Sequence, residues 1–99
     1  MIEKIKSDDV DYLFKAIMSL ENIDEFYNFF EDICTISEVC EMSKRLKAAK
    51  MLKNGIVYNE ISETTGLSTA TISRVNRCLK YGSGGYSLAL DRLEKSEEK

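Results

Sequence analysis

The 99-residue sequence contains no histidine and no proline, and it has only three cysteines. Histidine is the commonest metal ligand and general base, so its absence argues against a metal site and against acid–base catalysis. Cys34, Cys40 and Cys78 form no CxxC pair, and their odd number favours buried thiols in a reducing compartment over a disulfide framework. No histidine is available to activate a nucleophile, and no glycine-rich phosphate loop is present. We therefore expect no enzymatic activity, no metal and no cofactor.

Long apolar runs are also missing. None approaches the length of a membrane-spanning helix, and no signal peptide opens the chain. Hydrophobic residues make up 43% of the sequence, which is typical of a globular protein. Without proline, long helices can run uninterrupted. Residues 1–99 are therefore expected to form a single all-α domain of a cytoplasmic protein, with no membrane contact.

Three helices are predicted in the first half of the chain, at about residues 10–20, 23–33 and 36–53. Apolar residues recur in each with helical spacing, and residues suited to helix ends flank them. The expected capping residues are Asp8 or Asp9, then Asn22 with Glu25, then Thr35 with Glu38, and finally Asn54 followed by Gly55.

The helix expected at 23–33 is apolar over more than half of its circumference, which is difficult for one short chain to cover. We infer that the first two helices also pack against a partner subunit and form a homodimer. A compact monomeric bundle is the alternative. The apolar residues of this helix are Ile23, Phe26, Tyr27, Phe29, Phe30 and Ile33.

Other parts of the chain carry weaker patterns. Residues 1–6 are expected to be a frayed arm, and 94–99 a disordered charged tail. A last helix is predicted at about 86–93. Its residues expected in the core are Tyr86, Leu90 and Leu93, and those on the inner face of the helix at 36–53 are Val39, Met42, Leu46, Ala49 and Leu52 or Met51.

Residues 57–80, VYNEISETTGLSTATISRVNRCLK, have the pattern of a helix-turn-helix. Gly66 follows the first helix, where the chain can turn with positive φ at no steric cost. Leu67 can fill the space between the two helices, and Ser68 is a good N-cap for the second. The predicted buried residues of the second helix are Ile72, Val75 and Leu79.

The opposite face of this second helix has short side chains near its N-terminus and cations toward its C-terminus. A helix that enters the major groove needs this distribution, because short side chains let the backbone approach and cations meet phosphates. The net charge of the chain is −3, but residues 44–82 carry eight cations and two acids. The local field steers a phosphate backbone more than the net charge does. Nevertheless, many all-α domains with similar helix pairs never contact DNA, and some of these lysines could form an ordinary solvated face.

Two segments carry a family resemblance: FxxFFEDICTISEVCEMSKRLKAAKMLKNG and TGLSTATISRVNRCLKYG. Over roughly residues 13–93 the chain resembles the tryptophan repressor superfamily, and within it TrpR-related proteins of the YerC/YecD type. The resemblance implies a six-helix TrpR-like fold and an intertwined homodimer, with dimerisation helices at about 8–53 and 84–93 and a helix-turn-helix at about 57–80. It also implies a sequence-specific DNA-binding transcriptional repressor. A two-fold dimer favours a palindromic double-stranded operator, with reading helices about 34 Å apart.

Roles can be assigned to individual residues as hypotheses. Thr69, Ala70 and Ser73 are expected to face base edges, and Arg77 and Lys80 to contact phosphate or base. Tyr58, Asn59 and the amides near Ser68 are expected to anchor the DNA backbone. The alternative function is a dimeric protein–protein adaptor, whose basic face meets an acidic partner without any specific operator.

The resemblance also points to an effector pocket, which departs from that of the tryptophan-binding repressor. Two arginines sandwich the indole there, and both have counterparts here. Val75, however, replaces a glycine that leaves room for the ring, and Cys78 replaces a serine that helps hold the ligand's amino group. Tryptophan is therefore not expected to bind, and the two arginines could instead bind another small molecule, phosphate or protein carboxylates. The matching pocket residues are Thr35, Arg45, Thr71, Arg74 and Cys78.

Overall fold

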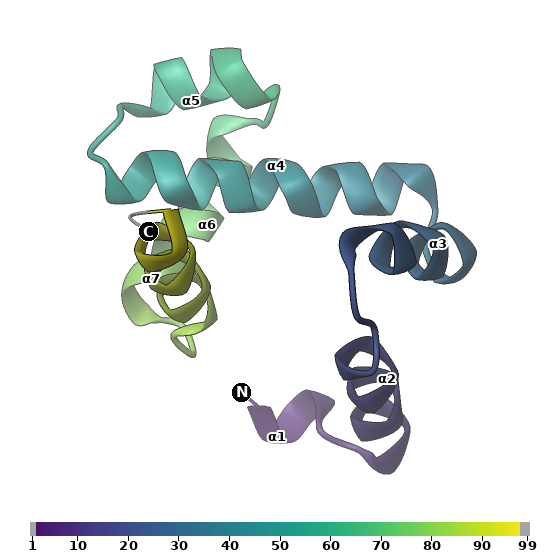
Figure 1. The fold of residues 1–99 in the computed structure, drawn as a ribbon. Coiled ribbons are helices and arrows are strands. Elements are labelled where there is room, and N and C mark those ends of the chain that lie inside the picture. The colour runs from purple at the N-terminus through teal and green to yellow at the C-terminus, as the bar shows by residue number, and fades with distance from the viewer. Residues whose placement is uncertain (1, 98–99) are drawn as a thin grey trace. The chain divides into compact units, whose positions relative to one another are not determined.

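The computed structural model describes residues 2–97, and in that part of the chain the regular elements are all helices (Figure 1). The all-α prediction is therefore confirmed, with one short helix more than the six expected. None of the described helices combines the length and apolar character needed to cross a membrane. The chain divides into two compact units, Met1–Val39 and Cys40–Lys99. The helices are α1 (Ile2–Ile5), α2 (Asp8–Met18), α3 (Ile23–Ile33), α4 (Ile36–Lys53), α5 (Tyr58–Thr65), α6 (Thr69–Tyr81) and α7 (Gly85–Glu97).

The first residues of the chain differ from the prediction. Residues 2–5 form α1, one short helical turn, where a frayed arm was expected. The N-cap of α2 is Ser7, whose hydroxyl accepts a hydrogen bond from Val10 N at 3.1 Å. Asp8 and Asp9 were expected to cap this helix but lie in its first turn. Their negative charge there interacts favourably with the positive end of the helix dipole, so Ser7, Asp8 and Asp9 all stabilise the start of α2.

The bounds of α3 agree with the prediction, as does its cap. Asn22 Oδ1 accepts a hydrogen bond from Glu25 N at 3.0 Å. The Glu25 carboxylate in turn accepts one from Glu21 N at 2.8 Å, one residue before the expected position. These local hydrogen bonds satisfy backbone amides that the first turn of a helix leaves without partners.

The apolar side chains of α3 are largely uncovered in the single chain. No residue of α2 or α3 is buried, and Ile23 and Tyr27 are 70% and 71% exposed. Phe30 stacks on Phe26 with ring centroids 6.4 Å apart and meets Phe29 edge-on at 5.6 Å. An apolar surface of this extent is typical of a protein–protein interface. It includes a hollow of about 430 Å³ lined by Ile23, Phe26, Tyr27, Phe30 and Val39.

Both predicted signals at the ends of α4 are confirmed. Thr35 Oγ1 accepts a hydrogen bond from Glu38 N at 3.1 Å, and the Glu38 carboxylate accepts one from Thr35 N at 2.8 Å, which makes a reciprocal capping box. The backbone hydrogen bond from Thr35 lowers the pKa of Glu38. At the other end, Gly55 adopts a φ of +78°, and the amides of Gly55 and Ile56 bind carbonyls of the last helical turn. This closure fixes where α4 ends.

The core of the unit Cys40–Lys99 lies between α4, α5, α6 and α7. Ala48 and Ala49 contribute the buried surface of α4, whereas Met42 and Leu46 are 46% and 38% exposed in the chain by itself. These two long side chains, which were expected on the inner face of α4, are therefore not covered within the single chain. Alanine fits because its short side chain lets neighbouring helices approach closely. The buried core residues are Ala48, Ala49, Ile61, Leu67, Ile72, Val75 and Leu90.

The last helix is longer than predicted. α7 extends to Glu97, so residues 94–97 are helical, and residues 98–99 lie outside the described part of the chain. Leu90 is buried as expected, but Leu93 is 50% exposed. The Lys53 ammonium at the end of α4 pairs with the carboxylates of Asp91 and Glu94 in α7. The hydrogen bond with Asp91 raises the pKa of Lys53, and the same contact lowers the pKa of Asp91.

Candidate nucleic-acid interface

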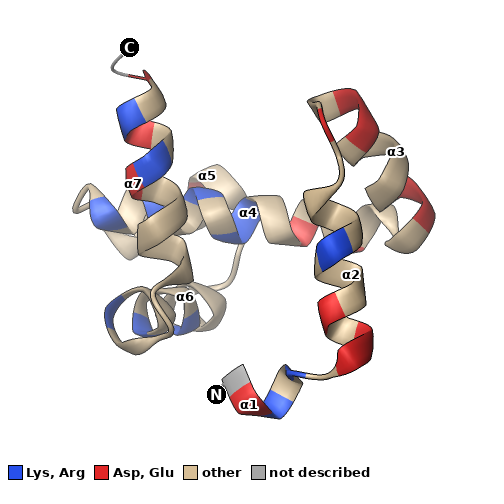
Figure 2. Cartoon of the chain, turned by 60° about the horizontal axis from the view of Figure 1, so that its bottom comes forward, with Lys and Arg blue, Asp and Glu red and all other residues tan. Residues whose placement is uncertain are grey.

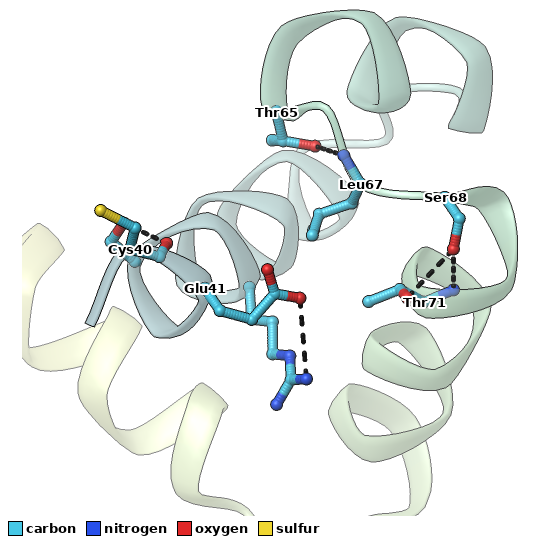
Figure 3. Close-up of polar contacts among 8 residues, drawn as sticks. Cys40, Glu41, Thr65, Leu67, Ser68 and Thr71 are labelled. Atoms are coloured by element: carbon cyan, nitrogen blue, oxygen red, sulfur yellow. Dashed lines mark hydrogen bonds and ion pairs between the residues drawn. The ribbon is translucent and has the colours of Figure 1, made fainter. Parts of the chain in front are cut away.

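α5 and α6 form a helix-turn-helix whose turn is closed by local hydrogen bonds. Gly66 ends α5 with a φ of +79°. The side chain of Leu67 is 5% exposed and points inward from the turn (Figure 3). Ser62 Oγ donates to Leu67 O at 2.7 Å, and Thr65 Oγ1 accepts from Leu67 N at 3.2 Å. Both backbone groups of Leu67 are therefore paired, which fixes the direction in which α6 leaves the turn.

Ser68 is the N-cap of α6, as predicted. Its hydroxyl accepts a hydrogen bond from Thr71 N at 3.1 Å and donates one to Thr71 Oγ1 at 3.0 Å (Figure 3). The cap satisfies one amide at the start of α6. Thr71 is thereby tied to the helix start, and the same residue lines a hollow beside α6.

The two faces of α6 differ sharply. Ile72 and Val75 are buried, and Leu79 is partly buried. The helix carries three cations and no acid, and Figure 2 shows Lys and Arg along α6 while Asp and Glu mark α2 and α3. A phosphate backbone would therefore meet no carboxylate of this helix. The predicted DNA-facing residues that are exposed are Asn59, Ser68, Thr69, Ala70, Ser73, Arg77 and Lys80.

Tyr58 differs from the other predicted DNA-binding residues because it is partly buried against the core. Its hydroxyl oxygen accepts a hydrogen bond from Asn76 Nδ2 at 3.0 Å, which links the first residue of α5 to the middle of α6. Asn76 was not identified from the sequence. The available signal was its position four residues after Ile72, where an inward-facing helix usually has an apolar side chain.

The predicted effector-pocket residues are only partly brought together. Arg45, Thr71, Arg74 and Cys78 line one hollow of about 140 Å³, together with Val75 and Tyr86. Thr35 lies in the other unit, and its hydroxyl caps α4. The Arg45 guanidinium also lies 3.7 Å from the Glu41 carboxylate, one turn earlier in α4 (Figure 3).

Tyr86 was predicted as a core residue and not as part of this hollow. Burial raises the pKa of its phenol, and the neighbouring Cys78 acts in the same direction, whereas Arg45 and Arg74 oppose the change. The phenol therefore stays neutral at physiological pH. The hollow thus combines two guanidinium groups with an aromatic ring that the chain itself supplies.

Known proteins resemble this chain over most of its length. Residues 8–94 match the Trp repressor protein family. The chain is 48% identical over 96 residues to the uncharacterized protein YerC of Bacillus subtilis (strain 168), covering 97% of this chain and 92% of that protein. The crystal structure of a TrpR-like protein from Eubacterium eligens ATCC 27750 is 52% identical and superposes with a TM-score of 0.90, covering 93% of this chain and 95% of the other. With its helix-turn-helix and its all-α scaffold, this chain belongs to the Trp repressor protein family.

Proposed function

We propose that this protein is a sequence-specific DNA-binding transcriptional repressor that acts as a homodimer in the cytoplasm. The single observation that carries the proposal is the exposed side of α6. It has short side chains at its start, cations at its end and no acid along its length. A duplex groove accepts a helix with this distribution, because the short side chains allow close approach and the cations reach phosphates.

The residues outside α6 support the same docking face. Asn59 lies in the exposed first turn of α5, and the N-cap of α5, Val57, makes no side-chain hydrogen bond to it. The N-cap of α6 lies just across the turn from α5. Backbone amides and short polar side chains at helix starts are suited to hold phosphates, while the α6 side chains read the bases.

The homodimer is proposed because the unit Met1–Val39 has no buried residue in the described part of the chain. Its aromatic side chains must be covered for the unit to be stable in water, since such a unit alone buries too little apolar surface to offset chain entropy. A second copy of the chain brings the same aromatic surface, and two apolar surfaces cover each other in an isologous two-fold interface. Two reading helices related by this axis would favour a palindromic operator.

We further propose that DNA binding does not need tryptophan. Val75 is 3% exposed and forms part of the wall of the hollow that also contains Arg45 and Arg74. At about 140 Å³, with Tyr86 already in its lining, the hollow leaves little room for an indole with its amino-acid group.

Selection of bound fragments from random duplex DNA, using the purified full chain with no added ligand, tests the proposal directly. The expected result is an enriched palindrome whose affinity falls steeply with salt. Enrichment only after addition of a small molecule would contradict effector independence. No affinity for any duplex at low salt would contradict DNA binding and favour the protein–protein adaptor with its basic face toward an acidic partner.

A further inference from the structure

The hydrogen bond between Asn76 and Tyr58 joins the two helices of the helix-turn-helix through their side chains. Asn76 Nδ2 donates to the Tyr58 hydroxyl oxygen at 3.0 Å, and the two residues lie 18 positions apart in the sequence. The pair spans from the first residue of α5 to the middle of α6. It is therefore placed to control both the angle between these helices and the orientation of the phenol.

An amide side chain at position 76 does not give the folded chain its greatest stability. Asn76 follows Ile72 by four residues and Val75 by one, so it flanks the buried face of α6 and is itself partly buried. An apolar side chain at this edge would bury more surface and lose no hydration of an amide. The neutral hydrogen bond that Asn76 makes offsets this loss only in part, because its net contribution is about 1 kcal/mol.

The direction of the hydrogen bond leaves the tyrosine able to donate. Tyr58 accepts from Asn76, so its own hydroxyl hydrogen has no acceptor among the described residues. A hydroxyl group that already accepts one hydrogen bond is polarised and becomes a better donor. Phosphate oxygens of DNA accept hydrogen bonds of this kind from tyrosine. Asn76 therefore prepares a donor at the start of α5, beside the exposed Asn59.

We infer that Asn76 is a positioning residue for DNA binding, which orients the Tyr58 hydroxyl so that it donates to a phosphate of the duplex. This inference rests on the proposed DNA-binding function and adds a residue to it. Asn76 itself contacts no DNA in this arrangement, and its effect passes through Tyr58. Because the contact is to the backbone, it strengthens binding to every duplex and does not select the operator.

A double-mutant cycle on duplex affinity tests the inference. Tyr58→Phe and Asn76→Leu are each expected to weaken binding to both the selected operator and a scrambled duplex by roughly 3- to 10-fold, the effect of one net hydrogen bond. The double variant is expected to have the same affinity as the single variant that binds less tightly, because both changes remove the same contact from the Tyr58 hydroxyl to phosphate. The slope of log affinity against log salt is expected to stay unchanged, since a neutral hydroxyl displaces no counterion.

Thermal unfolding separates this role from a structural one. Asn76→Leu is expected to be at least as stable as the wild type, because leucine suits a partly buried helix position better than an amide. Lower DNA affinity together with unchanged or higher stability supports positioning. Equal losses of affinity and stability, additive losses in the double variant, or wild-type affinity of either single variant would overturn it.

Two control variants complete the design. Ser62→Ala removes another hydrogen bond of the same helix-turn-helix, the one from Ser62 Oγ to Leu67 O, and is expected to lower stability. Its effect on duplex affinity is expected to add to that of Tyr58→Phe. Ser96→Ala removes an exposed hydroxyl near the end of α7, outside the helix-turn-helix and outside the unit Met1–Val39, and is expected to change neither duplex affinity nor stability. If the wild type binds no duplex at low salt, the proposed function fails. If it binds but the cycle shows no coupling, only the role of Asn76 fails.

Discussion

A few individual residues shape the hollow between Arg45 and Arg74. Val75 is buried, and Tyr86 brings an aromatic ring into the same lining. The two guanidinium groups could pair with anions, but Glu41 already lies 3.7 Å from Arg45. Such exposed pairs contribute little to stability, so this contact leaves Arg45 available to another anion. The steric effect of Val75 and Tyr86 is the stronger constraint on a ring-shaped ligand.

Titration calorimetry with millimolar L-tryptophan is therefore expected to show no saturable binding in the micromolar range. The physical reason is that the indole would have to displace the side chains of Val75 and Tyr86, and forcing extra volume into a packed site costs about 1–3 kcal/mol. Inorganic phosphate and acetate serve as matched titrants, because they test the charge of the two guanidinium groups without a ring. Saturable micromolar heats with L-tryptophan would contradict the prediction.

The cations of α6 give a second prediction at the scale of single residues. Arg77→Ala is expected to weaken binding to every duplex and to reduce the salt slope by about one, because one phosphate contact is lost. Affinities measured by anisotropy over a series of salt concentrations provide the slope. Arg92→Ala, which removes an exposed arginine from α7, is the matched control and should leave the slope unchanged. Unchanged affinity and slope in Arg77→Ala would show that α6 does not dock through this face.

At the scale of helices, the features set by neighbouring residues were predictable and those set by distant contacts were not. The spacing of the capping residues alone located several helix ends, because each cap involves amides or carbonyls only a few residues away. These residues are Asn22, Thr35 with Glu38, Gly55 and Gly66. The predicted N-cap of α2 was wrong because Ser7, Asp8 and Asp9 are adjacent in the sequence and all three residue types are suited to a helix start. The predicted end of α7 was wrong because the residue that pairs with this helix, Lys53, lies far away in the sequence and gives no local signal.

The candidate site divides in the same way. The exposed side of α6 follows from helical spacing, since the buried positions fix the opposite face. The link from Asn76 to Tyr58 and the position of Tyr86 in the hollow depend on how α5, α6 and α7 pack, which no local pattern encodes. Ala48 is a similar case, because alanine gives little periodic signal in a hydrophobic pattern.

The capping box of α4 leads to a prediction about acid stability. The pKa of Glu38 is lowered in the folded chain by the backbone hydrogen bond from Thr35, from an ordinary value of 4.5. The unfolded chain therefore binds this proton first, so the contribution of Glu38 is present above its unfolded pKa and is lost as pH falls through the folded pKa. Glu38→Gln keeps an oxygen acceptor but cannot titrate. Its urea midpoint is expected to fall less than that of the wild type between about pH 6 and about pH 3.

The other half of the box gives a matched pair of variants. Thr35→Ala is expected to lower the free energy of unfolding by about 1 kcal/mol, because the Glu38 amide loses its acceptor. Ser37→Ala, an exposed neighbour in the first turn of α4, should change stability by less than about 0.5 kcal/mol. Equal effects of the two substitutions, or equal acid sensitivity of Glu38→Gln and the wild type, would mean that the box does not stabilise α4.

For the whole molecule, charge and exposed apolar surface are distributed differently over the two units. Outside residues 44–82 the chain carries six cations and fifteen acids, so the basic surface is confined to the part that contains the helix-turn-helix. An acidic surface elsewhere discourages phosphate from binding in other orientations. The unit Met1–Val39 instead offers aromatic surface, which suits contact with a second chain.

The homodimer is the prediction on which the two-fold operator depends. Sedimentation is expected to give the mass of two 11.3 kDa chains, and the unfolding temperature should rise with protein concentration. Ile23→Asp places a charge on a side chain that is 70% exposed in the single chain, so it should shift the mass toward one chain while leaving the core of the unit Cys40–Lys99 intact. It should also weaken operator binding far more than binding of a single half-site. Asn28→Asp, an exposed position of the same helix, is the matched control and should remain dimeric. A wild-type chain that sediments alone at every concentration would contradict the two-fold arrangement, and with it the expectation of a palindrome.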